Sequence, residues 1–215
     1  KHKTFEDYKK MYDRSISDPE GFWGEIAEEF TWFKKWDKVR EYDFDNNIDI
    51  KWFEGSQTNI TVNCLDRHVE AGNGDRVGII WEGNDPKDSQ KYTYKQLLDE
   101  TCKFANVLKD KGVKRGDRVT IYMPMIVELP IAMLACARIG AIHSIVFGGF
   151  SAEALVDRMT DSESTCVITS DGAYRGKKSI PMKKTVDDAM KKCDALGNKV
   201  TTCIVFKHTG ETIDM

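Results

Sequence analysis

The sequence predicts an α/β protein with a mainly parallel sheet and helices on both faces, preceded by an N-terminal layer rich in aromatic residues. Three observations lead to this prediction. From about residue 76, short apolar runs rich in β-branched residues alternate with amphipathic segments of helical length. Capping residues or glycines mark several of the junctions. Right-handed crossovers between parallel strands would then determine most of the topology.

The N-terminal region combines many aromatic residues with many charges. At its first clear helix start, Asp18 is the predicted cap, Pro19 the first helical residue and Glu20 a favourable charge for the helix dipole. A ligand platform is one reading of the aromatic residues, but packing onto a larger body explains them better. We therefore expect residues 1–75 to be an extension that packs on the main domain, and residues 76–215 to be its first, incomplete α/β subdomain. The aromatic residues concerned are Phe5, Tyr8, Tyr12, Phe22, Trp23, Phe30, Trp32, Phe33, Trp36, Trp52 and Phe53.

The regular part of the chain begins with a predicted strand at residues 76–81. After a polar stretch at residues 83–90, a capping box of Thr93 and Gln96 predicts a helix that Gly112 ends. The mostly apolar helix at 127–139 is interrupted early by Pro130 and ended by Gly140, and Ser151 caps the next one. The remaining elements are strands at 118–123, 142–146, 166–169 and 200–206, a helix starting at 151 and a helix at 181–193.

Composition excludes several classes of protein. The 215 residues are 40% hydrophobic and 31% charged, which is ordinary for a soluble globular domain. The net charge of −3 provides no general cationic field for nucleic acid or an anionic membrane. No apolar stretch approaches the roughly 20 residues needed to cross a bilayer, and the polar start lacks the apolar core of a secretory signal. We therefore expect a soluble protein without nucleic-acid or membrane partners.

The cysteines predict a reducing compartment and no metal site. They are scattered, form no C-x-x-C pair and lie mostly in apolar segments, where a thiol behaves as a small hydrophobic group. The cytoplasm is the expected location, with the nucleus and the mitochondrial matrix as alternatives. Because the chain begins without methionine and ends just after a strand-like run, we expect it to be a piece of a longer protein. The cysteines are Cys64, Cys102, Cys136, Cys166, Cys193 and Cys203.

Two segments predict a binding site for a phosphorylated ligand. The run FGGFS at residues 147–151 follows one predicted strand, and DGAYRGKK at residues 171–178 follows the next. If the two strands are parallel neighbours, both segments leave the same carboxyl edge of the sheet, where open α/β folds bind ligands. A glycine pair lets a ligand approach the backbone. Arg175 can bind a phosphate in bidentate fashion, and Tyr174 can lie flat against a purine.

Each segment also has a simpler interpretation. The glycine pair can be a tight turn followed by a capping serine. Further lysines after the second segment can belong to a solvated helix face, and a nucleic-acid groove would need a broader basic stripe with more aromatic residues. A nucleotide phosphate is the better interpretation of the basic segment.

No complete catalytic constellation is visible. Asp66, Arg67 and Glu70 lie on a probable helix, where they can pair with one another, and His68 has no second histidine at metal-ligand spacing. His143 lies in an apolar strand pattern and is interpreted as a hydrogen-bonded core histidine. The motifs of P-loops, zinc proteases and α/β-hydrolases do not occur. The sequence therefore predicts no catalytic and no metal-binding residues in this chain.

A series of motifs resembles the N-terminal third of the AMP-forming acetate–CoA ligases, the acetyl-coenzyme A synthetase family within the adenylate-forming superfamily. The series runs from about residue 4 to residue 215 in order and with matching spacings. The resemblance implies activation of acetate with ATP and magnesium to acetyl-adenylate, followed by transfer of the acetyl group to coenzyme A. A propionate-activating ligase and a non-catalytic nucleotide-binding module are the alternatives. The motifs are WFEG at 52–55, NCLDRH at 63–68, RIGAIHSIVFGGFS at 138–151 and RGKKSIP at 175–181.

The resemblance also assigns roles to residues. In this family the nucleotide of coenzyme A lies against the Phe-Gly-Gly turn and the basic loop, and the family often has arginine where Lys178 stands. The phosphate loop, the adenine and acetate pockets, the magnesium ligand and the adenylating lysine belong to later sequence, so the chain alone is expected to be inactive and to need the remainder of its own chain. The implied coenzyme A ligands are Phe147, Gly148, Gly149, Arg175, Gly176, Lys177 and Lys178.

Overall fold

The computed structural model describes residues 4–46, 48–176 and 178–215 and divides into two compact units. The first unit comprises Lys1–Asn63 and the second Cys64–Met215. The division lies earlier in the chain than residue 75, where the aromatic-rich extension was expected to end. Among the described residues, no helix combines the length and apolar character needed to cross a bilayer.

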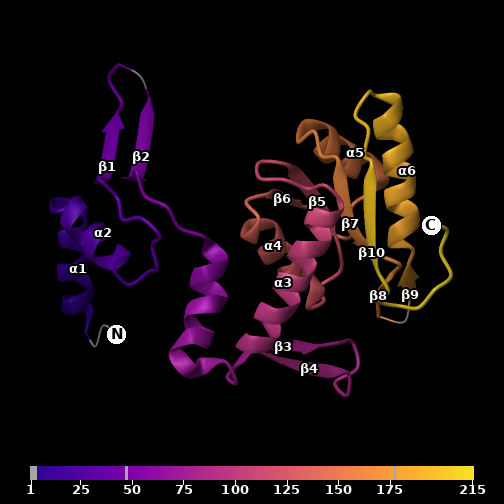
Figure 1. The fold of residues 1–215 in the computed structure, drawn as a ribbon, viewed down its shortest axis with the longest axis horizontal. Coiled ribbons are helices and arrows are strands. Elements are labelled where there is room, and N and C mark those ends of the chain that lie inside the picture. Colours follow the sequence, from indigo (N-terminus) through magenta and orange to yellow (C-terminus); the bar gives the residue numbers. More distant parts are fainter. Residues whose placement is uncertain (1–3, 47, 177) are drawn as a thin grey trace. The chain divides into compact units, whose positions relative to one another are not determined.

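The first unit contains two helices and a β-hairpin (Figure 1). The Asp18 carboxylate accepts a hydrogen bond from the backbone N–H of Gly21 at 3.0 Å, and Pro19 is the first residue of the second helix. This confirms the predicted helix start. The elements are α1 (Phe5–Ser17), α2 (Pro19–Ala27), β1 (Lys38–Asp43) and β2 (Asp49–Glu54), with β1 and β2 antiparallel.

Aromatic rings form much of the packing inside the first unit. The rings of Trp32, Trp36 and Phe53 lie with their centroids 5.1 to 5.4 Å apart. The indole N–H of Trp32 donates to the carbonyl oxygen of Ala27 at 2.8 Å, which satisfies its one polar group. These aromatic residues therefore pack mainly on one another within the unit.

The second unit is built on a four-stranded parallel sheet with the strand order β10–β7–β5–β6 (Figure 1). The strands are β5 (Arg118–Tyr122), β6 (Ile142–Ile145), β7 (Cys166–Ser170) and β10 (Thr202–Phe206). The helices are α3 (Tyr94–Asp110), α4 (Glu128–Arg138), α5 (Ala152–Asp161) and α6 (Met182–Ala195). Two π-helical segments precede them: Val62–Asp66, which includes the point of division between the units, and Val69–Asn73.

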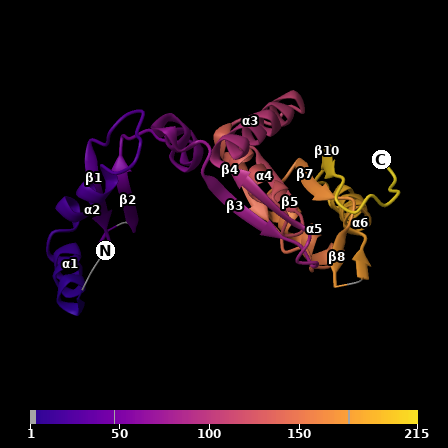
Figure 2. The same cartoon turned by 90° about the horizontal axis from the view of Figure 1, so that it is seen from below.

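Helices cover both faces of this sheet, as predicted. Helices α3 and α4 share one buried cluster with Val119, Ile121 and Ile168. Helices α5 and α6 share a second cluster with Tyr122 and Val167 on the opposite face. Because side chains alternate along a strand, β5 and β7 contribute to both clusters. Figure 2 shows strands β5, β7 and β10 between the two helix pairs.

The first predicted strand forms but does not join the parallel sheet. Strand β3 (Val77–Glu82) pairs antiparallel with β4 (Ser89–Thr93), in a separate hairpin. The expected alternation is therefore wrong at its first step, because the stretch interpreted as a polar connection leads directly into a return strand. The hairpin contacts the main body through the indole N–H of Trp81, which donates to the carbonyl oxygen of Met125 at 2.7 Å.

Local signals for helix ends are confirmed. Thr93 and Gln96 form the predicted reciprocal capping box of α3, and Ser151 caps α5. Gly112 ends α3 with φ of +87°, a conformation that side chains with a Cβ rarely adopt. The predicted interruption of α4 by Pro130 is wrong. Pro130 lies in the first turn, where its missing N–H has no intrahelical partner to lose.

Candidate functional site

The strand order identifies the edge where a ligand site is expected. From β5 the chain passes to β6 on one side and then crosses back to β7 on the other side. The direction of winding thus reverses between β5 and β7, and open α/β sheets bind ligands outside the carboxyl ends of the strands at such a reversal. The expectation that β6 and β7 are neighbours is wrong, because β5 lies between them. Since all four strands are parallel, both candidate segments still leave the same edge.

The glycine turn, residues 147–150, follows β6. The N–H of Phe150 donates to the carbonyl oxygen of Phe147 at 3.0 Å, and Ser151 then caps α5. Tyr122, almost fully buried at the end of β5, places its hydroxyl 3.1 Å from the carbonyl oxygen of Gly148 and 2.8 Å from that of Phe150. Tyr122 therefore holds the turn from inside, while Phe147 is 70% exposed at its surface.

Gly148 lies where the chain is closely packed. A Cβ added there would lie 3.1 Å from Cε of Met182 and 3.2 Å from the carbonyl oxygen of Met123. Met182, at the start of α6, is fully buried, and its Sδ accepts a hydrogen bond from the Ser170 hydroxyl at 3.5 Å. Met182 thus joins the glycine turn to the end of β7, where the basic segment begins.

The basic segment is a short β-hairpin rather than the expected loop. Its strands are β8 (Ala173–Arg175) and β9 (Lys178–Ile180), and Arg175 pairs directly with Lys178 across them. Gly176 supplies the φ of +61° at the tip, and its carbonyl oxygen accepts a hydrogen bond from the Asn84 side chain at 3.3 Å. Lys177 lies outside the described residues. The basic hairpin, residues 173–180, therefore holds two like charges opposite each other, which is unfavourable unless an anion neutralises them.

Asp171 connects the basic hairpin to the turn that follows β10. It is only 2% exposed, and its carboxylate accepts four backbone N–H groups at 2.7 to 2.9 Å. Burial opposes ionisation of this carboxyl, but the four hydrogen bonds outweigh it and hold the pKa of Asp171 at about 2. The four donors are Gly172, His208, Thr209 and Gly210.

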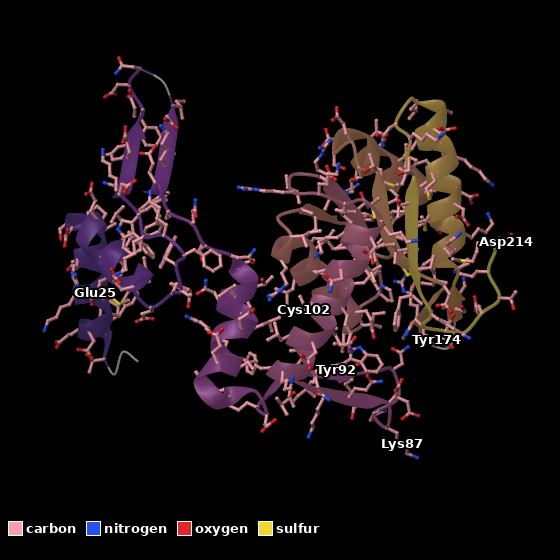
Figure 3. All side chains as sticks on the ribbon, viewed as in Figure 1. Glu25, Lys87, Tyr92, Cys102, Tyr174 and Asp214 are labelled. Carbon is pink, nitrogen blue, oxygen red and sulfur yellow. The ribbon has the colours of Figure 1, made fainter. Side chains whose placement is uncertain are left out.

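Tyr174 lies on the basic hairpin, near the carboxyl end of β10 (Figure 3). It is 52% exposed, and its ring centroid is 5.9 Å from that of His208 in an edge-to-face arrangement. Sequence reasoning selected Tyr174 and included Asp171 in the candidate segment without assigning it a role. It missed Tyr122 and His208 as parts of this edge. A signal for Asp171 was its place directly after a buried strand, but its partners are distant in the sequence.

The other polar residues considered earlier have structural contacts. Asp66 forms a bidentate ion pair with Arg138 of α4, a partner that sequence reasoning did not name, and both hydrogen bonds are 2.8 Å long. The hydrogen bond from Arg138, followed by the charge attraction, outweighs burial and lowers the pKa of Asp66. The His68 ring lies 4.9 Å from that of Tyr94.

His143 is half-buried in β6, and burial lowers its pKa. The six cysteines are free thiols. Within residues 4–46, 48–176 and 178–215, no group of three His, Cys, Asp or Glu side chains is arranged to hold a metal ion.

The topology defines an open α/β protein with its candidate ligand edge at a reversal of winding. The chain belongs to the AMP-binding enzyme family, whose sequence model matches residues 65–213. A second model, described as the acetyl-coenzyme A synthetase N-terminus, matches residues 8–64. The boundary between the two matches coincides within a residue with the division between the compact units.

Curated relatives are similar over nearly the whole chain. It is 54% identical over 205 residues to an acetyl-coenzyme A synthetase of Syntrophobacter fumaroxidans, covering 95% of this chain and 31% of the relative. It is 55% identical over 204 residues to that of Marinobacter nauticus, covering 94% and 31%. It is 51% identical over 211 residues to that of Drosophila melanogaster, covering 95% and 32%. The chain thus spans about a third of the length of these relatives.

Proposed function

We propose that this chain is the N-terminal part of an AMP-forming acetate–CoA ligase and that its carboxyl edge binds the nucleotide end of coenzyme A. The observation that carries the site is the direct pairing of Arg175 with Lys178 on the basic hairpin. Bound phosphate would remove the repulsion between these cations. The names of the relatives support acetate rather than propionate as the acid.

The proposed reaction has two steps. A carboxylate oxygen of acetate attacks the α-phosphorus of ATP, so an acyl–phosphate bond forms and pyrophosphate leaves. The thiol of coenzyme A then attacks the acyl carbon, a carbon–sulfur bond forms, AMP leaves and the thiol proton is released. Magnesium would accompany ATP, and the resemblance places the groups that bind ATP, magnesium and acetate beyond residue 215.

The part of this chain in that reaction is to hold coenzyme A. The proposed ligands are Phe147, Gly148 and Gly149 of the glycine turn and Arg175, Gly176, Lys177 and Lys178 of the basic hairpin. Tyr122 and Met182 fix the glycine turn, and the β-pairing fixes the two described cations at the hairpin tip. Positioning the nucleotide in this way would place the thiol arm for attack without chemical participation of these residues.

The test compares the Arg175→Ala variant with wild type in the full-length ligase. A charge-assisted hydrogen bond contributes about 1.5–3 kcal/mol. The KM for coenzyme A should therefore rise by roughly 10- to 100-fold, while ATP–pyrophosphate exchange, which precedes coenzyme A binding, should stay unchanged. Arg115→Ala, an exposed arginine before β5 at the opposite edge of the sheet, is the matched control. An unchanged KM in Arg175→Ala would contradict the proposed site.

The purified 215-residue chain should release no pyrophosphate with acetate and ATP. Robust release would refute its assignment as an incomplete ligase.

The cysteines support a reducing compartment such as the cytoplasm, because all six are free and three of them are buried.

A further inference from the structure

We propose that Lys183 is a positioning residue of the ligase, whose buried ammonium group fixes the path of the exit strap, residues 207–214, by which the chain leaves strand β10. This inference rests on the proposed function. In that reaction the exit strap joins the part that holds coenzyme A to the groups for ATP, magnesium and acetate, which the resemblance places beyond residue 215. Neither the motifs nor the family match assigns a role to Lys183.

The ammonium group of Lys183 is buried and fully hydrogen-bonded. Lys183 lies in the first turn of α6 and is only 6% exposed. A buried charge is costly unless it is paired and its remaining donors are satisfied. Here Nζ donates to the two carboxylate oxygens of Asp187 at 2.6 and 2.8 Å, and to the carbonyl oxygen of Asp214 at 3.0 Å. Three acceptors therefore match the three N–H donors of the group.

The contact with the exit strap is what distinguishes this ion pair from an apolar alternative. A pair of apolar side chains of similar volume is often as stabilising as a buried ion pair. Such a pair has no donor for a backbone carbonyl group, whereas the ammonium group of Lys183 supplies one to Asp214. Figure 3 shows Asp214 on the part of the chain that passes beside α6. Holding the strap is therefore the contribution that only the charged pair makes.

The exit strap is held at its other end by the buried Asp171. The carboxylate of Asp171 accepts hydrogen bonds at 2.7 to 2.9 Å from the backbone N–H groups of His208, Thr209 and Gly210. The backbone N–H of Lys183 donates to the carbonyl oxygen of Asp171 at 3.4 Å, so the two anchors are themselves connected. Two buried charges of opposite sign thus fix the strap against the end of β7 and the start of α6.

The first turn of α6 also contacts the glycine turn. Met182 precedes Lys183 and is fully buried, and a Cβ added to Gly148 would lie 3.1 Å from its Cε. Adjacent residues of one helix therefore touch a proposed coenzyme A loop and the exit strap. Since a displacement of about 1 Å between reacting groups can slow a reaction by roughly 100-fold, α6 is placed to align the coenzyme A thiol with the acyl carbon.

The experiment measures the acyl-transfer step of the full-length ligase in a single turnover. Enzyme carrying acetyl-adenylate is mixed with saturating coenzyme A, and acetyl-coenzyme A is quantified after rapid quenching. Lys183→Met should slow this step about tenfold, because the strap loses one anchor. The rate of ATP–pyrophosphate exchange and the Kd for coenzyme A, measured by titration calorimetry, should stay unchanged, since neither requires the two parts to be aligned.

Lys184→Met is the matched control. Lys184 is the next residue of α6 and forms an ion pair of the same i,i+4 geometry with Asp188 at 2.7 Å, but its side chain is 71% exposed. Its loss should leave the acyl-transfer rate unchanged. A decrease in that rate equal to the decrease in Lys183→Met would overturn the positioning role.

A second variant separates positioning from folding. Lys183→Met alone leaves the partly buried Asp187 carboxylate without its partner and should lower the Tm. Combining it with Asp187→Leu removes both charges and should restore most of the Tm, while acyl transfer stays slow. In both variants, hydrogen exchange at residues 211–214 should be faster than in wild type, because the strap is free at that end.

The outcomes separate this inference from the proposed function. A wild-type acyl-transfer rate in the variant that combines Lys183→Met and Asp187→Leu would mean that Lys183 only stabilises α6. Unchanged hydrogen exchange at residues 211–214, or an equal slowing of ATP–pyrophosphate exchange, would also refute the positioning role. Failure of the proposed function would appear in Arg175→Ala instead, as an unchanged KM for coenzyme A.

Discussion

Replacing the buried Asp171 carboxylate should lower stability in a way that depends on pH. The hydrogen bonds to backbone N–H groups favour its ionised form, with a pKa of about 2 in the folded chain against an ordinary 3.8. At about 1.36 kcal/mol per pH unit, this difference corresponds to ~2 kcal/mol of stability at neutral pH. Asp171→Asn, which cannot ionise, should lose most of that amount at pH 7.

Stability falls in acid because the unfolded state holds the proton on Asp171 more tightly than the folded state does. The unfolded Asp171 binds a proton near pH 4 and the folded one only near pH 2, so acid favours unfolding across that window. The contribution is complete above about pH 5, falls by ~1 kcal/mol by pH 3, and is gone below about pH 2. The gap between wild type and Asp171→Asn should therefore shrink by roughly half on going from pH 7 to pH 3.

The assay is urea unfolding of both proteins at a series of pH values, followed by near-ultraviolet circular dichroism. Asp157→Asn, an exposed aspartate on α5, controls for general effects of removing a carboxylate. A stability gap that stays constant from pH 7 to pH 3, or one no larger than in the Asp157→Asn control, would refute the reasoning. Either result would mean that the backbone N–H groups do not favour the ionised form.

Three further predictions concern other contacts. Tyr122→Phe removes the hydroxyl that binds two carbonyl oxygens of the glycine turn. It should lower the free energy of unfolding by ~1 kcal/mol, measured by thermal unfolding, and raise the KM for coenzyme A a few-fold. An unchanged KM would show that the hydroxyl does not support binding. Asp66→Ala removes the bidentate carboxylate from the half-buried Arg138. It should lower the free energy of unfolding in urea by ~1–3 kcal/mol. A decrease no greater than that of Asp157→Asn would argue against a stabilising role of this ion pair. Burial raises the pKa of the Cys136 and Cys166 thiols to about 12, so mass spectrometry after iodoacetamide treatment at pH 8 should find both unmodified until urea is added.

Local chemistry in the sequence was sufficient to predict most elements of the second unit. The capping box at Thr93 and the cap at Ser151 depend on residues three apart, and both formed as expected. The apolar runs that became β5 and β7 are buried on both faces, which is why they read as continuous hydrophobic strands. Burial and capping leave a direct signature in the chain.

Strands without a clear apolar pattern in the sequence were missed. Strand β4 has the sequence SQKYT, with no alternation of apolar residues, and β8 and β9 are three residues each in a cationic stretch. The strand order was also outside the reach of sequence reasoning, since nothing local requires β5 to lie between β6 and β7. The same holds for Asp171, whose turn partners lie 37 to 39 residues away.

The open edges of the parallel sheet affect the solubility of the purified polypeptide. In the part of the chain that the structure describes, β6 and β10 are its outer strands, each paired along one side, and Ile142 and Ile145 of β6 are largely exposed. Open strand edges with apolar side chains can recruit strands from other molecules. Recombinant preparations of the 215-residue polypeptide should therefore form oligomers or precipitate as concentration rises, and Ile142→Lys should improve the yield without altering the glycine turn.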